Sequence, residues 1–385
     1  MSVICNNGGF KYVVKCFICT IGLVVLYICI EVFVTDGNGP ILESISSMKF
    51  YGQAEKPKIA IIVVTHRDGT GQYSLALDSI KCYCQARGYE FILIFNDRNE
   101  KCGQRDITFQ HFFRRHCHVA NEIANSTINY FLFIDADIGV VNPKRKIEEF
   151  IDPKFDMIYY NRFYNQEITA GSYIAKNTNW TIKYLRDYAN YETKLPRGDH
   201  GKDNGGLHAY IAEVLFPKRP IEIASCWMVY NQSRNHNDLF TFEACIQTLL
   251  GIDEDISGRI KIFKKGTGWC RDSWLTNSLW NSTTDFMIHG WKNSRMINYT
   301  EKELPLTIRE RDRGRWYNPY AGPLDLSKCT PGNDTWNFDP NIQTTVERIR
   351  EKLDKYYAQF EMDKINRLSR LSWYFQKKTE PPKKT

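Results

Sequence analysis

Three apolar runs of strand length recur in the first half of the chain, and each is separated from the next by a stretch of helical pattern. The runs are KIAIIVVT at 58–65, EFILIFND at 90–97 and YFLFIDAD at 130–137, and helices are expected at 74–89 and at about 107–123. Strands that lack polar alternation are buried on both faces, and strands that alternate with helices pair in parallel. The sequence therefore predicts an α/β fold with a mostly parallel sheet flanked by helices.

The second half of the chain gives weaker signals. A strand is expected at 156–160, a helix at 180–188, a polar loop at 197–206 and a helix at 207–215, whereas residues from about 225 to 335 show no clear period. Apolar residues at helical spacing in 346–378 predict a long C-terminal helix that packs on the body through a face that includes Ile349, Phe360 and Ile365. A dimerising coil is the alternative for this helix.

An uncharged segment near the N-terminus, residues 16–30, extends to a span at 13–34 that reaches the roughly 20 residues a bilayer requires. Lys11 and Lys15 lie on its N-terminal side, and Glu31 and Asp36 follow it, so the positive-inside rule directs the rest of the chain into the lumen. We expect a single-pass type II protein of the Golgi or ER membrane. A cleaved signal peptide is the alternative, but the sequence VFVTDG offers no small-x-small cleavage site.

Two counts agree with a lumenal body. Six glycosylation sequons all follow the apolar segment, and they start at Asn125, Asn179, Asn231, Asn281, Asn298 and Asn333. Eight of the 12 cysteines also follow it, an even number that permits disulfides without fixing their pairing. The expected organisation is a cytosolic tail at 1–12, a transmembrane signal anchor at 13–34, a stem at 35–57, a main domain at 58–335, and a C-terminal helix with a basic tail at 336–385.

The charge of the chain argues against a nucleic-acid partner. The formal net charge is only +7, and part of it belongs to the lysines of the C-terminal tail. A nucleic-acid site requires a basic stripe, often with interleaved aromatic side chains, and the sequence shows none. The lumenal topology would also keep the body away from nucleic acid.

Two aspartates stand one residue apart at the end of the third apolar run, in FIDADIG. In extended geometry Asp135 and Asp137 share a face, and a divalent cation is the simplest partner that makes like charges favourable there. A helix cap with a solvated loop acid is the alternative. Further along, His289 offers a third ligand, Gly290 allows close backbone approach, and Lys292 can meet a phosphate as a point charge.

Several stretches, taken in order, resemble a known family. They are IVVTHRDGTGQYSLALDSIKCYCQARGYEF at 62–91, FLFIDADIGVVNP at 131–143, ITAGSYIAKNTNWTIKYLRDY at 168–188, DNGGLHAYI at 203–211 and HGWK at 289–292. Together they are similar to GT-A glycosyltransferases, in detail to the galactosyl/mannosyltransferase group of fungal Golgi mannan enzymes and plant galactomannan galactosyl- and xyloglucan xylosyltransferases. The resemblance covers about residues 58–295 and implies a GT-A-like, Rossmann-like sheet in a glycosyltransferase-like domain.

The resemblance implies a role for each matching residue. Asp135, Asp137 and His289 would hold Mn²⁺ (or Mg²⁺) on the diphosphate of a UDP- or GDP-sugar. Asp203 and Asn204 would be the catalytic pair, for which helix capping is the alternative. The expected nucleotide-sugar site comprises Thr65, His66, Arg67, Tyr73, Asp97, Ala136, Gly290 and Lys292. The implied reaction is retaining transfer of a hexose or pentose to a glycan or glycoprotein acceptor in the secretory pathway.

Two other functions fit parts of the pattern. FIDADIG and GDHGKD also resemble the signatures of haloacid-dehalogenase-type phosphatases, in which the first aspartate is a nucleophile and the second an acid/base. That motif normally lies on the opening strand, whereas here two strand–helix units precede it. A non-catalytic lumenal glycan-binding protein is the other alternative, although the acid pair with His289 argues for a retained metal site.

Overall fold

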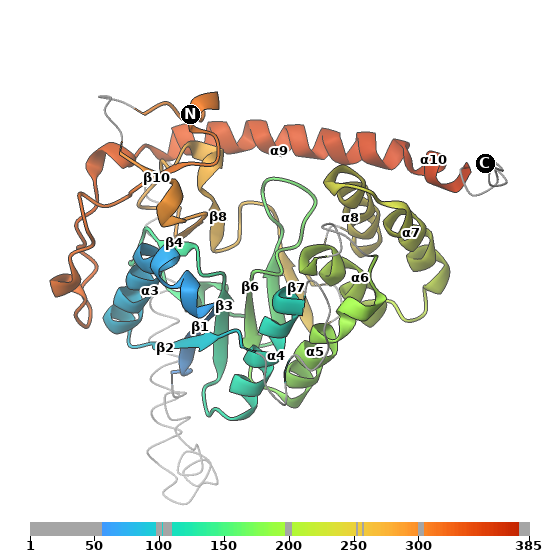
Figure 1. The fold of residues 1–385 in the computed structure, drawn as a ribbon, viewed down its shortest axis with the longest axis horizontal. Helices are drawn as coiled ribbons and strands as arrows, with labels where there is room; N and C mark the ends of the chain where they lie inside the picture. Colours follow the sequence, from blue (N-terminus) through green and yellow to red (C-terminus); the bar gives the residue numbers. More distant parts are fainter. Residues whose placement is uncertain are drawn as a thin grey trace, which may run out of the picture. The chain divides into compact units, whose positions relative to one another are not determined.

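A six-stranded sheet forms the centre of the computed structural model, which describes residues 56–97, 102, 110–196, 202–251, 253–255, 258–298 and 304–376 (Figure 1). Residues 57–385 form one compact unit. The predicted tail, anchor and stem lie outside the described residues, apart from positions 56 and 57 at the end of the stem. Among the helices that are described, none is both long and apolar enough to cross a bilayer.

The strand order of this sheet is β2-β1-β3-β6-β5-β7. The strands are β1 (Ile59–Thr65), β2 (Glu90–Phe95), β3 (Tyr130–Ile134), β5 (Met157–Tyr160), β6 (Ser172–Lys176) and β7 (Ile260–Phe263). β1 pairs in parallel with β2 and β3, and β5 pairs in parallel with β7. β6 alone in this sheet runs antiparallel, to β3 on one side and β5 on the other. The predicted α/β fold with a mostly parallel sheet is confirmed, whereas β6 was not predicted.

Five helices share a core with one face of the sheet (Figure 1). They are α4 (Gln110–Ala124), α5 (Asn179–Ala189), α6 (Asp203–Leu215), α7 (Pro220–Gln232) and α8 (His236–Leu250). The first two of them pack on each other, and so do the last three. Ala60, Ile62 and Val64 of β1 point into this layer and are buried. Since alternate residues of a strand face opposite sides, Ile61 and Val63 lie in the second core, on the other face.

The second core is closed by α3 (Ser74–Arg87) and by a small sheet of order β4-β9-β8. Its strands are β4 (Ile138–Val140), β8 (Cys270–Asp272) and β9 (Met287–His289). α3 ends at Gly88, whose φ of 74° is left-handed and closes the helix through a hydrogen bond to the Cys84 carbonyl. β4 begins directly after the Asp135–Asp137 turn, so the small sheet is anchored to the end of β3.

The second half of the chain differs in two places from what the sequence predicted. Helices α7 and α8 occupy part of the region that showed no helical period, because α8 buries residues around most of its circumference and has no polar stripe. α6 begins at Asp203, four residues before the expected start, so Asp203 and Asn204 lie within its first turn. The polar loop was expected to include them.

The C-terminal helix packs on the body as predicted but with a narrower face. It consists of α9 (Val346–Ser369) and α10 (Leu371–Gln376), and α9 contacts α8 and the short helix η5 (Ser273–Thr276). Ile349 and Phe360 are buried, whereas Ile365 is 60% exposed. Ile365 was expected on the packed face, and its exposure shows that this face does not continue along the whole helix.

Three disulfides join elements of the compact unit. Cys82–Cys329 ties α3 to the segment that precedes α9, and Cys226–Cys245 ties α7 to α8. Cys102–Cys117 ties the connection after β2 to α4. Cys84 and Cys270 are buried free thiols among the described residues. Six of the eight cysteines that follow the apolar segment are therefore paired.

Candidate functional site

The predicted metal-ligand side chains meet at the carboxyl edge of the main sheet. Asp135 and Asp137 follow β3, and His289 ends β9, where it pairs with Ile138 of β4. One ligand atom from each of Asp135, Asp137 and His289 lies within 4.8 Å of the others. Two carboxylates and an imidazole form a donor set that suits a Mn²⁺-like divalent cation. The residues present therefore fit the predicted cation.

Main-chain hydrogen bonds fix the positions of these ligands. The Asp137 carbonyl accepts from the amides of Gly290 and Trp291, both at 2.9 Å. Gly290 has a φ of 110°, a conformation that L side chains rarely adopt, so this close crossing favours glycine. Lys292 follows, and its Nζ lies 3.6 Å from Asp137 Oδ2. The HGWK segment thus contributes both the imidazole and a nearby ammonium.

A second layer of charged groups orients His289. Its Nδ1 lies 2.8 Å from Asp272 Oδ1, and its Nε2 lies 3.2 Å from Asp137 Oδ1. Asp272 stands opposite His289 in the β8–β9 pairing and is buried. Arg162 donates to Asp272 at 2.6 Å and to Glu167 at 2.8 Å. A carboxylate on Nδ1 fixes the orientation of a metal-binding imidazole, so Asp272 presents Nε2 to the acid pair.

Arg115 of α4 links the two regions of the site. Its guanidinium forms ion pairs with Asp135 and with Asp203, the first residue of α6. Asp203 is buried, and His116 Nε2 lies 3.6 Å from its Oδ2. The Asn204 side chain accepts from the amide of Ala170 at 2.9 Å, which ties α6 to the segment before β6. Asp203 and Asn204 are therefore held across the site from the metal ligands.

Charge partners set the protonation of the site. Burial raises the pKa of Asp137, but His289 and Lys292 outweigh it and hold that pKa at about 2. Burial lowers the pKa of His289, whereas Asp137 and Asp272 raise it to about 10. Burial likewise raises the pKa of Asp203, and Arg115 and His116 bring it down to about 2.

Asp135 behaves differently from its neighbour. Burial raises its pKa, against the lowering effect of Arg115, and the negative charge of Asp137 adds to the rise. Gly171 leaves room for its carboxylate, because a Cβ at that position would lie 2.1 Å from Asp135 Oδ2. The pKa of Asp135 is therefore raised, unlike that of Asp137, and its carboxylate occupies the space that a side chain at position 171 would take.

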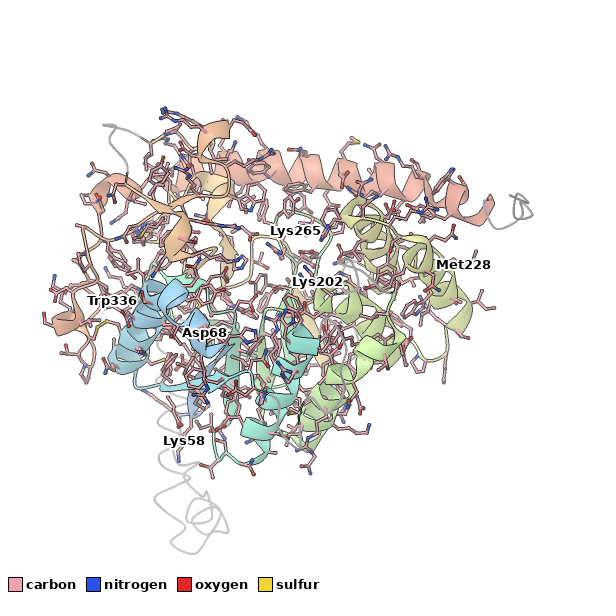
Figure 2. The ribbon with its side chains drawn as sticks, viewed as in Figure 1. Lys58, Asp68, Lys202, Met228, Lys265 and Trp336 are labelled. Carbon is pink, nitrogen blue, oxygen red and sulfur yellow. A yellow bond between two sulfur atoms is a disulfide. The ribbon has the colours of Figure 1, made fainter. Side chains whose placement is uncertain are left out.

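A cavity of about 230 Å³ opens beside these groups. Asp135, His289, Asp203 and Asn204 line it, together with basic side chains from four different segments: Arg115, Arg162, Lys202 and Arg271. In Figure 2, Lys202 lies near the middle of the compact unit, whereas Lys58, which precedes β1, lies at the opposite end of the strands. Ligands of mostly parallel sheets bind at the carboxyl ends of the strands, which is where this cavity lies.

The residues expected around the nucleotide lie along the same edge. Thr65 is buried at the end of β1, and Arg67 and Asp97 are exposed and paired with each other at 3.0 Å. The His66 and His111 rings lie 5.9 Å apart. None of the four predicted residues Thr65, His66, Arg67 and Asp97 is among the described residues that line the 230 Å³ cavity, and neither is His111.

Tyr73 connects this edge with the acid pair. Burial raises its pKa, and the charges of Asp137 and Asp135 raise it further. The loop that carries it meets the HGWK region, since Gln72 Nε2 donates to Ser294 Oγ at 2.6 Å. Ala136, between the two aspartates, is partly buried against the second core. Tyr73 thus lies on the side of the acid pair that faces the predicted nucleotide residues.

Arg115, Arg162 and Asp272 were missed by sequence reasoning. Arg115 lies on a helix whose pattern predicts only an amphipathic element, and its two partners are far away in the sequence. Asp272 was missed because β8 is only three residues long and no local pattern indicates its pairing with β9. The one available signal was chemical, since a histidine ligand usually has a carboxylate or carbonyl partner for its second nitrogen.

Comparison with protein families gives a direct assignment. The chain belongs to the family described as protein of unknown function, DUF273, which matches residues 80–305. That range contains the acid pair, Asp203, Asp272 and His289 of this chain, but begins within α3, after β1 and its loop. No curated protein matches the chain in sequence.

Similar solved structures include three glycosyltransferase chains. One is a glycosyltransferase involved in the glycosylation of the major capsid of PBCV-1, with a TM-score of 0.41 and 15% identity over 60% of this chain and 93% of that one. Another is the apo form of GlyE of Streptococcus pneumoniae TIGR4, with a TM-score of 0.31 and 15% identity over 42% and 44%. A further GlyE structure has a TM-score of 0.28 and 16% identity over 39% and 43%.

Proposed function

We propose that the chain is a metal-dependent glycosyltransferase that moves a hexose or pentose from a nucleotide-diphosphate sugar to a glycan or glycoprotein acceptor, with retention of anomeric configuration. The observation that carries the proposal is the meeting of Asp135, Asp137 and His289 beside a cavity that Asp203 also lines. The order of the motifs in the sequence supports the same reaction. UDP- or GDP-sugars are the expected donors.

The chemistry of the site follows from its charges. A bound Mn²⁺ (or Mg²⁺) would act as a Lewis acid that neutralises the negative charge developing on the leaving diphosphate. Lys292 brings a second positive charge to the same side, 3.6 Å from Asp137. Asp203 and Asn204 face the cavity from the opposite side, where an anionic and an amide side chain can orient sugar hydroxyls. Arg115 keeps Asp135 and Asp203 at a fixed separation.

We also propose that this reaction takes place in the secretory pathway, with the chain anchored by residues 13–34. The three disulfides support an oxidising compartment. Asn125, Asn179 and Asn231 are exposed and compatible with glycosylation. Asn281 is not, because its side chain is buried and donates to the Thr344 carbonyl at 2.7 Å. Enzymatic deglycosylation of the chain produced in a secretory host should therefore reduce its mass without any contribution from Asn281.

The test is a thermal-shift screen of nucleotide sugars with the purified full-length chain and Mn²⁺. We expect one class of UDP- or GDP-sugar to raise the melting temperature only when Mn²⁺ is present. Asp135→Asn should abolish this coupling, whereas Glu222→Gln, which changes an exposed carboxylate of α7, should preserve it. The proposal would be refuted if the folded wild-type chain bound no nucleotide in a metal-dependent way.

Product analysis separates the alternatives. Transfer or hydrolysis of the stabilising nucleotide sugar supports the transferase. Release of phosphate from phosphomonoesters, with Asp135 as the nucleophile, would instead identify a phosphatase. Glycan binding without turnover of any donor would identify a binding protein.

A further inference from the structure

Two more cavities lie beneath α9, and the first of them shares lining residues with the metal-site cavity. Their volumes are about 320 Å³ and 330 Å³, within the range of ligand pockets in proteins. Both are lined by Asn161, Lys265 and Tyr357, so they lie on the two sides of the same three side chains. We call the two cavities together the α9 groove.

The α9 groove reaches the metal-site cavity through β8. Cys270 and Arg271 line both the 320 Å³ cavity and the 230 Å³ metal-site cavity, as do Tyr160 and Phe163. The next residue of the strand is Asp272, which contacts His289. A ligand in the groove would therefore lie within the length of one short strand from the metal ligands. The three cavities thus follow one another, each sharing lining residues with the next.

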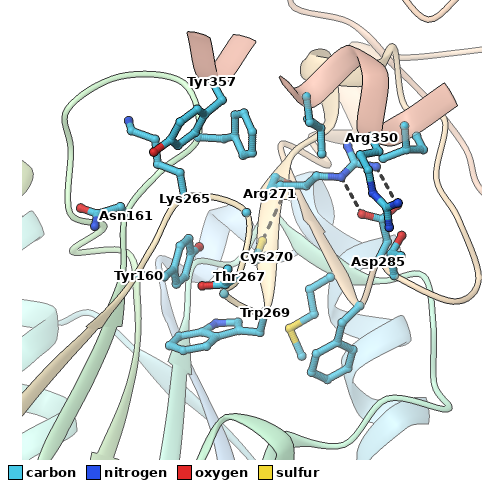
Figure 3. A pocket seen from close by; sticks show the side chains of 18 of the residues that line it. Tyr160, Asn161, Lys265, Thr267, Trp269, Cys270, Arg271, Asp285, Arg350 and Tyr357 are labelled. Carbon is cyan, nitrogen blue, oxygen red and sulfur yellow. Dashed lines mark hydrogen bonds and ion pairs between the residues drawn. The ribbon is translucent and has the colours of Figure 1, made fainter. Parts of the chain in front are cut away.

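The walls of the groove have the chemistry of a carbohydrate site. Figure 3 shows Tyr357 and Arg350 projecting from α9 on one side, with Tyr160 and Trp269 opposite them. The exposed Tyr357 ring offers an apolar face to the C–H surface of a sugar, whereas Tyr160 and Trp269 are buried in the opposite wall. Charged and amide groups of the lining can bind sugar hydroxyls. Tyr357 is 47% exposed at the rim, so its ring is accessible to a ligand in the groove.

The charge of the groove favours a neutral ligand. Five cationic and four anionic side chains line its two cavities: Lys264, Lys265, Arg271, Arg350 and Lys364, with Asp253, Asp285, Asp354 and Glu361. Arg271 and Asp285 are already paired, at 2.6 Å. A sulfated or uronic-acid glycan would meet nearly as many like charges as opposite ones. A neutral sugar can use both kinds of group as hydrogen-bond partners.

We propose that the α9 groove binds a neutral oligosaccharide acceptor, whose reacting sugar points across β8 toward the metal-site cavity. The role of the oligosaccharide as an acceptor rests on the proposed function, whereas its binding to the groove can be tested alone. Tyr357 is then a specificity-determining residue that stacks on one sugar of the chain. The C-terminal helix forms one wall of the substrate site and also packs on the body.

The test measures glycan binding and nucleotide binding separately, on the purified full-length chain. The probes are a printed array of neutral mannose-, galactose- and xylose-containing oligosaccharides, a matched set of sulfated and sialylated glycans, and UDP or GDP with Mn²⁺. Tyr357→Ala removes the stacking surface, and Tyr357→Phe restores it at the same position. Met362→Ala is the matched control on α9, because Met362 is 58% exposed and lies outside the residues that line the groove.

We expect neutral oligosaccharides to bind, and Tyr357→Ala to weaken that binding about tenfold or more while nucleotide binding is unchanged. Tyr357→Phe and Met362→Ala should bind like the wild type. Equal binding by Tyr357→Ala, or preference for the charged glycans, would overturn the inference. Nucleotide binding without any glycan binding would overturn the groove and leave the proposed function standing. Glycan binding that depends on Tyr357, in a chain that binds no nucleotide, would support the groove and refute the transferase.

Discussion

Gly171→Ala is expected to damage the metal site selectively. A methyl group at this position would lie 2.1 Å from Asp135 Oδ2 and 2.7 Å from its Cγ. Ordinary contact begins at 3.4 Å, so the carboxylate must move by about 1.3 Å. The ion pair with Arg115 limits the directions in which it can move. The clash is with the end of a side chain and not with backbone, so the fold can tolerate the methyl group at a cost of about 1–3 kcal/mol.

The expected losses follow from that displacement. Losing the position of one ligand should reduce Mn²⁺ affinity by about 10- to 100-fold, which is the range seen when supporting groups of metal sites are removed. Misplacement by about 1 Å should reduce transfer activity by about 100-fold. Mn²⁺ titration followed by the electron paramagnetic resonance of the free ion measures the affinity, and a thermal melt checks folding.

Matched variants make this result interpretable. Gly71→Ala is the control, because a methyl group there meets nothing within 4 Å. Asp135→Asn gives the reference for a damaged ligand. A folded Gly171→Ala protein that binds Mn²⁺ as tightly as the wild type would refute the assignment of Asp135 as a ligand held in this position.

Three further predictions concern the groups around the ligands. Asp272→Asn removes the carboxylate on His289 Nδ1, so Mn²⁺ affinity should fall by about 10- to 100-fold and the imidazole-nitrogen modulation in the Mn²⁺ electron spin-echo spectrum should weaken; an unaltered spectrum and affinity would contradict the orienting role. Arg115→Met leaves the buried Asp203 and the half-buried Asp135 without their cation, so urea denaturation should show a loss of about 3–5 kcal/mol in the free energy of unfolding. An unchanged midpoint would argue against both ion pairs. Burial lowers the pKa of His116 from 6.5 to about 4, so the unfolded chain takes up a proton first as the pH falls. The contribution of His116 to the free energy of unfolding is complete above pH 6.5 and is lost as the pH falls toward 4, by about 3 kcal/mol in total. A His116→Gln variant with an equally steep pH dependence of unfolding would show that another group is responsible.

Local patterns of the sequence were sufficient for the elements that build the central sheet. β1 and β3 are continuous apolar runs of strand length, so they can be recognised without knowledge of the strands with which they pair. The three residues of the candidate metal site were also predictable, because Asp135, Asp137 and His289 are of residue types that bind divalent cations. These three side chains meet because β4 pairs with β9. No sequence pattern indicated that pairing, although the choice of His289 as the third ligand required it.

The supporting residues could not be predicted in the same way. Arg115 and Asp272 act through partners that are distant in the sequence, and neither lies in a motif with a recognisable spacing. α8 was missed for a related reason, since it is buried on most sides and its apolar residues do not repeat with a helical period. Periodicity reports a boundary between core and solvent, and it is silent where no such boundary exists.

The unpredicted reversal of β6 explains how the site acquires its supporting groups. β5 ends at the carboxyl edge of the sheet, and because β6 runs antiparallel it begins at that same edge, where Ser172 pairs with Ile134 of β3. The connection between them, residues 161–171, is therefore confined to the site. It carries Arg162 to Asp272, and it carries Gly171 to Asp135. Its Gln166 side chain also donates to the Phe360 carbonyl of α9 at 2.9 Å. Residues 161–171 thus support the candidate metal ligands at both ends and contact α9 at their middle. The same segment therefore links the position of α9 to the geometry of the candidate metal site.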